Sequence, residues 1–224
     1  MRKKMIIAID GPAASGKSTT AQRLASRLGY VYLDTGAMYR ACALKAKRLS
    51  IEPDDEDSIA RMLGQIDIRI ELSSDRNVIL LDGEDVSQAI RADEISHLAS
   101  TVSALPAVRH KMVELQRLMA REGGVILDGR DIGTYVFPDA ELKFFLTADA
   151  RVRALRRWKE LRGKGVEIDL DTVLTDLLQR DKNDQSRALA PLMAAEDAIR
   201  VDTSHLSIEQ QVETLYQYAL ERLK

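Results

Sequence analysis

The stretch from Asp10 to Thr19 constrains this chain more than any other part of the sequence. Within it, Gly11 to Ser18 match the pattern G-x-x-x-x-G-K-[ST], and the apolar run Met5 to Ile9 comes directly before. Apolar residues then recur at helical spacing: Ala21, Leu24, Ala25 and Leu28. This context predicts a buried strand, a phosphate-binding loop and a helix, in that order.

The loop has the chemistry of a nucleoside triphosphate site. Its glycines let successive backbone N–H groups converge on a phosphate, and the helix that follows points its positive dipole end at the same anion. The Lys17 ammonium can reach the β- and γ-phosphates, and the Ser18 hydroxyl can be a ligand of Mg²⁺. The residues expected to hold the nucleotide are Gly11, Pro12, Ala13, Ala14, Ser15, Gly16, Lys17, Ser18 and Thr19. The alternative is a chance match of a short pattern in a glycine-containing loop.

The bulk properties set limits on the class of protein. A chain of 224 residues with a net charge of −2 suits one catalytic domain and provides no basic surface for nucleic acid. Its single cysteine, Cys42, excludes an intrachain disulfide and fits a reducing compartment. No apolar run approaches the length of a membrane span. We therefore expect a cytoplasmic monomer that acts on small molecules and has neither a nucleic-acid nor a membrane partner.

Five apolar runs alternate with helical patterns along the chain. The expected strands lie at Met5–Ile9, Tyr30–Leu33, Val125–Leu127, Leu142–Leu146 and Ala198–Asp202. Strand, helix, strand at this spacing indicates parallel pairs with right-handed crossovers. The sequence thus predicts an α/β, three-layer fold of the P-loop NTPase type, with a five-stranded parallel sheet. We treat residues 1–224 as a single domain.

A different texture interrupts this pattern over residues 65–90. Ile66, Ile68 and Ile70 alternate with charged residues, and the run Val78–Leu81 leads into Asp82-Gly83. Alternation with a period of two and Asp-Gly turn chemistry predict antiparallel hairpins, with a turn at Ser73–Asn77. We expect a small β-lobe inserted into the α/β domain.

A second anion-binding arrangement follows the second expected strand. Thr35 and Gly36 open a helix, and Arg40 lies about one turn further on. A hydroxyl, a helix N-terminus and a guanidinium at this spacing suit a phosphate. A capped helix with a surface arginine explains the same residues.

Arginines also gather at two later places. Arg130, between Asp128 and Asp131, follows a buried strand at the edge where such folds bind ligands, although a local ion pair would explain it too. Arg153, Arg156 and Arg157 can share one face of a helix, as a phosphate clamp or as a solvated basic surface. Arg180, Asp184 and Arg187 would share another face if their helix continues.

Two phosphate sites and an arginine-bearing segment are what phosphoryl transfer requires, because catalysis there consists of alignment and charge neutralisation. The three histidines show no metal-ligand spacing. A P-loop GTPase would need an Asn-Lys-x-Asp motif, which does not occur, and it would leave the arginines unexplained. A catalytically idle nucleotide-binding module, and a kinase for another small acceptor, remain as alternatives.

Taken together, these residues resemble the bacterial cytidylate kinases, a branch of the nucleoside monophosphate kinases. The resemblance covers essentially the whole chain. The motifs that carry it are Ile9–Pro12 before the loop, Leu33–Arg40, Asp128–Thr134 with Val136–Ala140, and Arg180-Asp181 with Arg187-Ala188 and Ala190–Leu192. Thr35 stands where some relatives have serine, which keeps the hydroxyl.

The resemblance implies transfer of the γ-phosphate of ATP to CMP or dCMP, with Mg²⁺ and with Ser18 as a metal ligand. It implies contacts to CMP from Thr35, Arg40, Ser100, Arg109, Arg130, Asp131, Arg180, Asp184 and Arg187. Residues with a part in the transfer itself would be Lys17, Arg130, Arg153, Arg157 and Arg187. It also implies an arginine-rich lid region at about 151–187, with the lid itself at Arg153–Gly165, and it leaves open which lid arginine touches phosphate.

Overall fold

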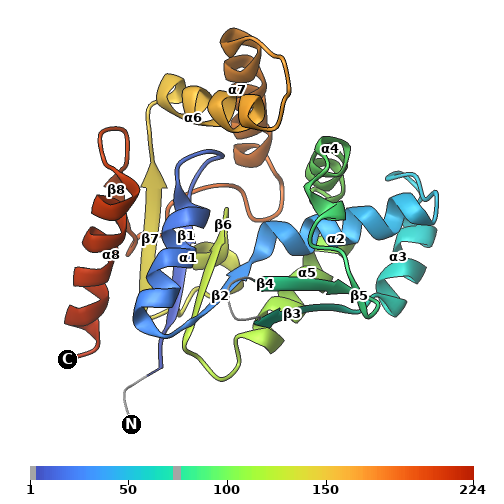
Figure 1. The fold of residues 1–224 in the computed structure, drawn as a ribbon. Helices are drawn as coiled ribbons and strands as arrows, with labels where there is room; N and C mark the ends of the chain where they lie inside the picture. The colour runs from blue at the N-terminus through green and yellow to red at the C-terminus, as the bar shows by residue number, and fades with distance from the viewer. Residues whose placement is uncertain (1–3, 73–76) are drawn as a thin grey trace. The chain divides into compact units, whose positions relative to one another are not determined.

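The computed structural model describes residues 4–72 and 77–224. Its main sheet has five strands in the order β2-β6-β1-β7-β8 (Figure 1). These strands are β1 (Ile6–Asp10), β2 (Val31–Asp34), β6 (Val125–Gly129), β7 (Leu142–Thr147) and β8 (Ile199–Asp202). Strand β1 pairs in parallel with β6 and β7, and β7 pairs in parallel with β8. The predicted five-stranded α/β sheet is confirmed.

The central position of β1 follows from its sequence. Ile7, Ala8 and Ile9 are fully buried, as expected of a strand that is covered on both faces. The register places Asp10, the last residue of β1, opposite Gly129 at the end of β6. The loops that leave these two strands therefore start next to each other.

Four long helices accompany this sheet. They are α1 (Lys17–Leu28), α6 (Ala150–Gly163), α7 (Leu170–Gln185) and α8 (Ile208–Arg222). Helices α1 and α8 lie side by side (Figure 1), and two ion pairs join them, Arg23–Glu209 and Arg27–Glu213. Ser207 caps α8 in a capping box with Gln210.

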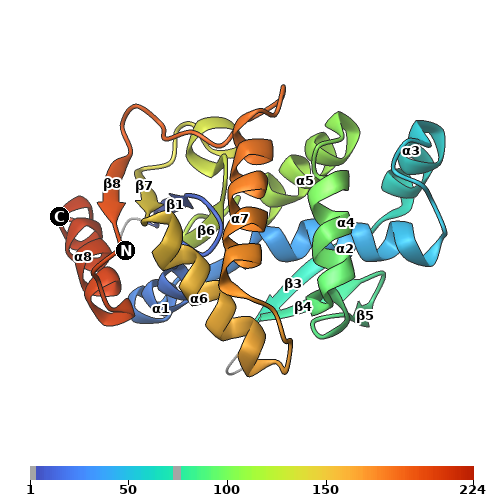
Figure 2. The ribbon, with the colours of Figure 1, turned by 90° about the horizontal axis from the view of Figure 1, so that it is seen from above.

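Helices α6 and α7 also lie side by side (Figure 2), within the predicted lid region. Their contact is apolar and includes one residue of the phosphate loop. The buried residues of this cluster are Ala13, Ala154, Leu161, Val173 and Leu177. Asp149 and Asp169 cap the N-termini of the two helices through their carboxylates. Residues 164–169 connect the helices and are not helical.

The remaining elements form a second group. They are α2 (Thr35–Arg48), α3 (Glu56–Gln65), β3 (Ile68–Leu72), β4 (Asn77–Leu81), β5 (Glu84–Asp85), a 3₁₀ turn (Ala89–Arg91), α4 (Asp93–Val102) and α5 (Pro106–Met119). Strands β3, β4 and β5 make an antiparallel sheet, as predicted, with Ile68 opposite Leu81 and Ile70 opposite Ile79. The predicted turn includes residues 73–76, which lie outside the described residues.

The chain divides into two compact units. We call Met1–Tyr32 with Gly123–Lys224 the core unit, and Leu33–Glu122 the inserted unit. Each has its own buried cluster: the core unit's is centred on Ile7, Ile9 and Phe144, and the inserted unit's on Met38, Ile59 and Met112. Within the part of the chain that the structure describes, none of the helices is both long and apolar enough to span a bilayer.

Candidate active site

The phosphate loop joins β1 to α1 and needs glycine at two positions. Gly11 has a φ of 151°, and a Cβ there would lie 2.1 Å from the carbonyl oxygen of Leu146. Gly16 has a φ of 91°, and a Cβ there would lie 2.7 Å from the side-chain oxygen of Gln211. The two glycines of the sequence pattern are thus required both by backbone conformation and by close packing.

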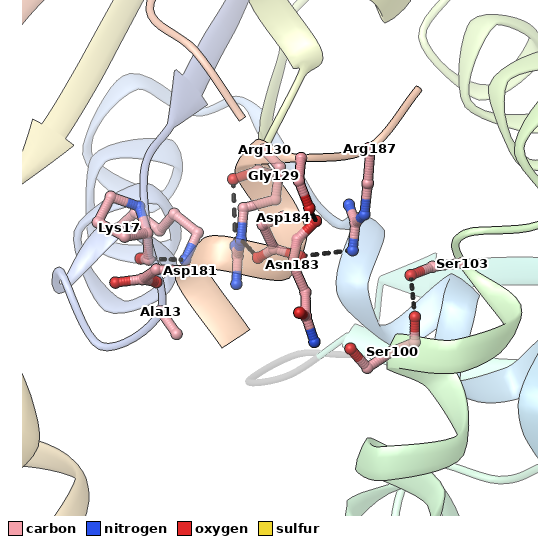
Figure 3. Close-up of polar contacts among 12 residues, drawn as sticks. Ala13, Lys17, Ser100, Ser103, Gly129, Arg130, Asp181, Asn183, Asp184 and Arg187 are labelled. Atoms are coloured by element: carbon pink, nitrogen blue, oxygen red, sulfur yellow. Dashed lines mark hydrogen bonds and ion pairs between the residues drawn. The ribbon is translucent and has the colours of Figure 1, made fainter. Parts of the chain in front are cut away.

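Lys17 begins α1 and has its ammonium group folded back over the loop. Its Nζ donates to the carbonyl oxygen of Pro12 at 3.2 Å, and the side chain is buried (Figure 3). Burial, together with the nearby Arg130 guanidinium, lowers the pKa of Lys17 to about 7, while Asp128 opposes the shift. The site therefore disfavours the charged ammonium until an anion binds.

Ser18 contacts a carboxylate from the neighbouring strand. Its Oγ donates to Oδ2 of Asp128 at 2.6 Å, and the hydroxyl of Tyr32 donates to Oδ1 of the same residue at 2.7 Å. A hydroxyl and a carboxylate are the hard oxygen donors that Mg²⁺ prefers, and phosphate-loop enzymes hold this ion with such a pair. The residues present therefore fit the predicted ion.

Asp10 ties the phosphate loop to the loop that follows β6. Its two carboxylate oxygens accept hydrogen bonds from the backbone N–H groups of Ile132 and Gly133, at 2.8 and 2.7 Å. These two residues begin a π-helical turn, Ile132–Val136, directly after Arg130 and Asp131. Burial raises the pKa of Asp10 to about 7, although the two backbone N–H groups counteract the rise.

Two predicted site residues, Arg130 and Arg187, meet at the carboxylate of a third, Asp184. Asp184 is buried and forms ion pairs with Arg130 at 2.7 Å and with Arg187 at 2.5 Å (Figure 3). Burial by itself would raise the pKa of Asp184, but the two guanidinium groups lower it below its usual value. Arg130 therefore pairs with a residue 54 positions away in the sequence and bonds the carbonyl of its neighbour Gly129.

Arg180, Asp184 and Arg187 do not share one helical face, because the helix does not continue as far as the third residue. Helix α7 ends at Gln185, so Arg187 lies beyond it. The carbonyl of Asp184 accepts a hydrogen bond from the backbone N–H of Leu192 instead of from a further turn of helix. The chain turns back at this point, and Arg187 reaches Asp184 from outside the helix.

The arginines of α6 differ in their surroundings. Arg153 is buried and donates to the carbonyl oxygens of Ala13 and Ala148 at 3.2 and 3.0 Å and to the Asp181 carboxylate at 2.6 Å. Arg157 is more exposed and pairs with Glu160 one turn later at 2.8 Å. The Arg153 side chain thus contacts the phosphate loop at the backbone carbonyl of Ala13. The role of Arg153 and Arg157 in phosphoryl transfer stays a prediction.

In the inserted unit, Thr35 begins α2 and is buried. Asp34 caps this helix by accepting from the N–H of Ala37 at 2.8 Å, and it forms ion pairs with Arg40 at 3.2 Å and with Arg91 at 3.5 Å. The capped helix, one of the two interpretations of Thr35 to Arg40, is therefore present. It also holds Arg40 close to the start of α2, where a phosphate contact is expected.

Ser100 and Arg109 lie near one another in the inserted unit. The Oγ of Ser103 donates to the carbonyl oxygen of Ser100 at 2.9 Å (Figure 3), and Arg109 donates to the carbonyl oxygen of Ser103 at 3.3 Å. The Arg109 guanidinium is buried and lies 6.0 Å from the centre of the Tyr39 ring. This cluster brings α4, α5 and the first turns of α2 together.

In the sequence, Asp128 stands out only as a neighbour of Arg130, and its contact with Ser18 is a finding of the structure. A carboxylate directly after a buried strand, in a chain with a phosphate loop, was the signal that could have identified it. Asp10 has a similar signal, because it ends the strand that precedes the loop. The hydrogen bonds from the Arg153 side chain to backbone carbonyls have no such signal in the sequence, since they depend on tertiary packing.

Sequence comparisons identify relatives of the chain. The family model of cytidylate kinase matches residues 7–221. A cytidylate kinase of Syntrophotalea carbinolica is 50% identical over 222 residues, which are 99% of this chain and 94% of that protein. A cytidylate kinase of Desulfitobacterium hafniense is 53% identical over 215 residues, which are 96% of this chain and 92% of that protein.

A comparison of structures supports the fold. A shikimate kinase from Bacteroides thetaiotaomicron superimposes with a TM-score of 0.50 at 14% identity, covering 98% of this chain and 99% of that one. At that identity the likeness concerns the fold alone. The family match extends over nearly all of the sequence, and the chain therefore belongs to the cytidylate kinase family.

Proposed function

We propose that the protein transfers the γ-phosphate of ATP to CMP or dCMP and releases ADP with CDP or dCDP. The observation that carries this proposal is the match to the cytidylate kinase family over residues 7–221. The geometry of the core unit supports it, because a phosphate loop with a buried lysine occurs together with paired arginines on one carboxylate. A simple nucleotide-binding module has no use for the second set of cations.

On the donor side, the loop backbone and Lys17 would bind the β- and γ-phosphates of ATP. The loop is pre-formed by Gly11 and Gly16, so little reorganisation is needed when the nucleotide arrives. Ser18 and Asp128 would hold Mg²⁺, which neutralises charge on the phosphate oxygens when bound. Lys17 would stabilise the negative charge that spreads over the transferred group.

On the acceptor side, arginines would orient the CMP phosphate. Arg40 and Arg130 present forked guanidinium groups, which match phosphate oxygens and stay charged at any relevant pH. The phosphate of CMP is itself the nucleophile and is already ionised, so no general base is needed. Arg130 and Arg187 both pair with Asp184, and this carboxylate keeps two cations close together despite their mutual repulsion.

The remaining predicted contacts would read the nucleoside. Asp131 can accept a hydrogen bond from the exocyclic amine of cytosine, and Arg109 can donate to its O2 or N3. Uracil lacks that amine and would leave Asp131 without its donor. Ser100, Arg180 and Asp184 complete the proposed contacts to base and sugar, and Thr35 adds a hydroxyl to the phosphate.

We propose that the protein works as a cytoplasmic monomer on small molecules, without a nucleic-acid or membrane partner. The near-neutral net charge of −2 supports the absence of nucleic acid, and the single, buried cysteine suits a reducing compartment.

A coupled spectroscopic assay of ADP formation tests the proposed reaction. CMP and dCMP should be phosphorylated in the presence of ATP and Mg²⁺, with kcat/KM values at least about a hundredfold above those for UMP and AMP. Equal rates with all four acceptors would rule out the base assignment. ATP binding without turnover of any acceptor would instead identify a nucleotide-binding module.

The base assignment can be tested at Asp131. Replacing it with alanine (Asp131→Ala) removes the acceptor for the cytosine amine, so the preference for CMP over UMP should fall by about tenfold or more. The KM for ATP should change by less than about twofold. Titrating each acceptor at saturating ATP measures the preference for CMP, and titrating ATP at saturating CMP measures the KM for ATP. A defect confined to ATP would contradict the proposed role of Asp131 in reading the base.

A further inference from the structure

Thr203 lies directly after β8, far from the phosphate loop in sequence, and is fully buried. Its Oγ1 lies 2.8 Å from the carbonyl oxygen of Ser15 in that loop and 2.9 Å from the carbonyl oxygen of Thr147 at the end of β7. Its own backbone N–H also donates to the carbonyl of Thr147, at 2.8 Å. The residue therefore joins the ends of two strands to the back of the loop.

The contact with Ser15 orients a different atom of the loop. A peptide unit is planar and trans, so the Ser15 carbonyl and the Gly16 N–H belong to one plane and point in opposite directions. A hydrogen bond that holds this carbonyl toward Thr203 therefore turns the Gly16 N–H the other way. Gly16 immediately precedes α1, where N–H groups without a helical partner are the ones that bind an anion.

An arginine of α6 fixes the Thr203 hydroxyl. Arg156 donates through one nitrogen to Oγ1 at 3.1 Å and through the other to the carbonyl oxygen of Thr203 at 2.5 Å. A hydroxyl has one hydrogen and two lone pairs. That of Thr203 can therefore accept from Arg156 while its single hydrogen is shared between the carbonyls of Ser15 and Thr147. Arg156, which the sequence places among the lid arginines, is thus bound to Thr203 behind the loop.

A second side chain from the same part of the chain also supports the loop. The side-chain oxygen of Gln211 accepts from Thr20 at 2.8 Å and lies 2.7 Å from the position that a Cβ on Gly16 would take. Its amide nitrogen donates to the carbonyl oxygen of Leu206 at 3.1 Å. Two consecutive loop residues, Ser15 and Gly16, therefore contact the segment that follows β8.

We propose that Thr203 is a positioning residue for ATP binding: it holds the Ser15 carbonyl so that the Gly16 N–H faces the bound phosphate, and Arg156 holds Thr203. The inference rests on the proposed function, because the loop must bind ATP. It makes Thr203 specific for the donor substrate, since within the described part of the chain its side-chain hydrogen bonds reach the phosphate loop, Thr147 and Arg156 but none of the residues proposed to contact CMP.

The test compares Thr203→Val with Thr203→Ser. Valine keeps the shape but lacks the hydroxyl, so the KM for ATP should rise by about tenfold or more, because small misplacements of a binding group have large effects. The KM for CMP should stay within about twofold of the wild type. Serine restores the hydroxyl and should restore the KM for ATP to within about threefold.

Two controls separate positioning from a loss of stability. Val212→Ala removes buried methyl groups from α8 and should lower the melting temperature without changing the KM for ATP. Thr214→Val removes a hydroxyl bonded within α8 and should change neither quantity. A Thr203→Val enzyme with the KM for ATP of the wild type, or with equal rises in both KM values, would overturn the proposal. A wild-type protein that does not phosphorylate CMP would refute the proposed function instead.

Discussion

Lys17 has its ammonium group buried in the phosphate loop, and its ionisation should respond to the nucleotide. Burial lowers the pKa of Lys17 to about 7 in the protein without nucleotide. A bound triphosphate places negative charge next to the ammonium and raises that pKa. The complex then binds more protons than the free protein, so ATP affinity should rise as the pH falls from about 9 toward 7.

Calorimetry can measure this proton uptake. ATP binding at pH 8 should take up on the order of 0.5–1 proton, seen as a difference in apparent enthalpy between buffers with unequal ionisation enthalpies. Lys17→Arg is the matched control, since a guanidinium stays charged in both states and should abolish this contribution. Equal uptake by the two proteins would show that Lys17 is already charged before ATP binds.

Gln116 is a second residue with a measurable consequence, this time for stability. It lies buried in α5, and among the residues that the structure describes neither the oxygen nor the nitrogen of its amide has a hydrogen-bond partner. Methionine has a similar shape and no strong polar atom, so Gln116→Met should raise the free energy of unfolding by about 1 kcal/mol or more. For a chain of this size that is roughly 2–4 °C in melting temperature.

The control for this prediction is Gln22→Met on the exposed side of α1. Surface substitutions of this kind change stability by less than about 0.5 kcal/mol. Urea unfolding followed by circular dichroism measures both variants. Destabilisation by Gln116→Met would mean that the amide is satisfied in solution, as by a buried water.

Among the elements, α6 and α7 are joined by a buried ion pair in addition to their apolar contact. Arg153 of α6 and Asp181 of α7 are both buried, 2.6 Å apart, and Arg153 also bonds the carbonyl of Ala13 in the phosphate loop. Removal of one partner leaves the other charge buried and unpaired, which costs about 3–5 kcal/mol. The pair therefore connects the predicted lid region to the loop.

A double-mutant cycle tests this connection. Asp181→Ala and Arg153→Met should each destabilise strongly, and the double variant should lose clearly less than the sum, with a coupling of about 2 kcal/mol or more. The exposed pair Glu160–Lys164 on the same helix serves as control and should show a coupling of about 0.5 kcal/mol or less. Chemical denaturation gives all the values. Equal coupling in the two pairs would contradict a special role for Arg153.

At the scale of the whole molecule, the proposed substrates use different residues in two compact units. Lys17 belongs to the core unit, and Arg40 belongs to the inserted unit. The two side chains are assigned to different phosphates. Their substitution should therefore affect the two substrates separately.

Reciprocal binding measurements test that separation. Lys17→Ala should abolish transfer but leave the dissociation constant for CMP within about twofold, whereas Arg40→Ala should weaken CMP by about tenfold or more and leave ATP nearly unchanged. Titration calorimetry with each nucleotide alone measures the constants. A large loss of CMP affinity in the Lys17→Ala protein would contradict the assignment of Lys17 to the donor.

The sequence by itself determined the strands of the fold and the glycine-rich loop between the first strand and the first helix. Local patterns predicted the strands of the main sheet and the hairpin strands β3 and β4. They could do so because strand burial, helix caps and glycine-dependent loops are set by residues close together in the chain. The phosphate loop belongs to the same class of signal.

Tertiary structure alone decided which side chains hold that loop in place. Asp128 reaches Ser18 across 110 residues, and Thr203 reaches Ser15 across 188. It also decided that Arg187 lies beyond the end of α7, which the spacing of Arg180, Asp184 and Arg187 left open. Local spacing contains no information on these contacts, because they arise only when parallel strands align in register and bring distant loops to the same edge of the sheet.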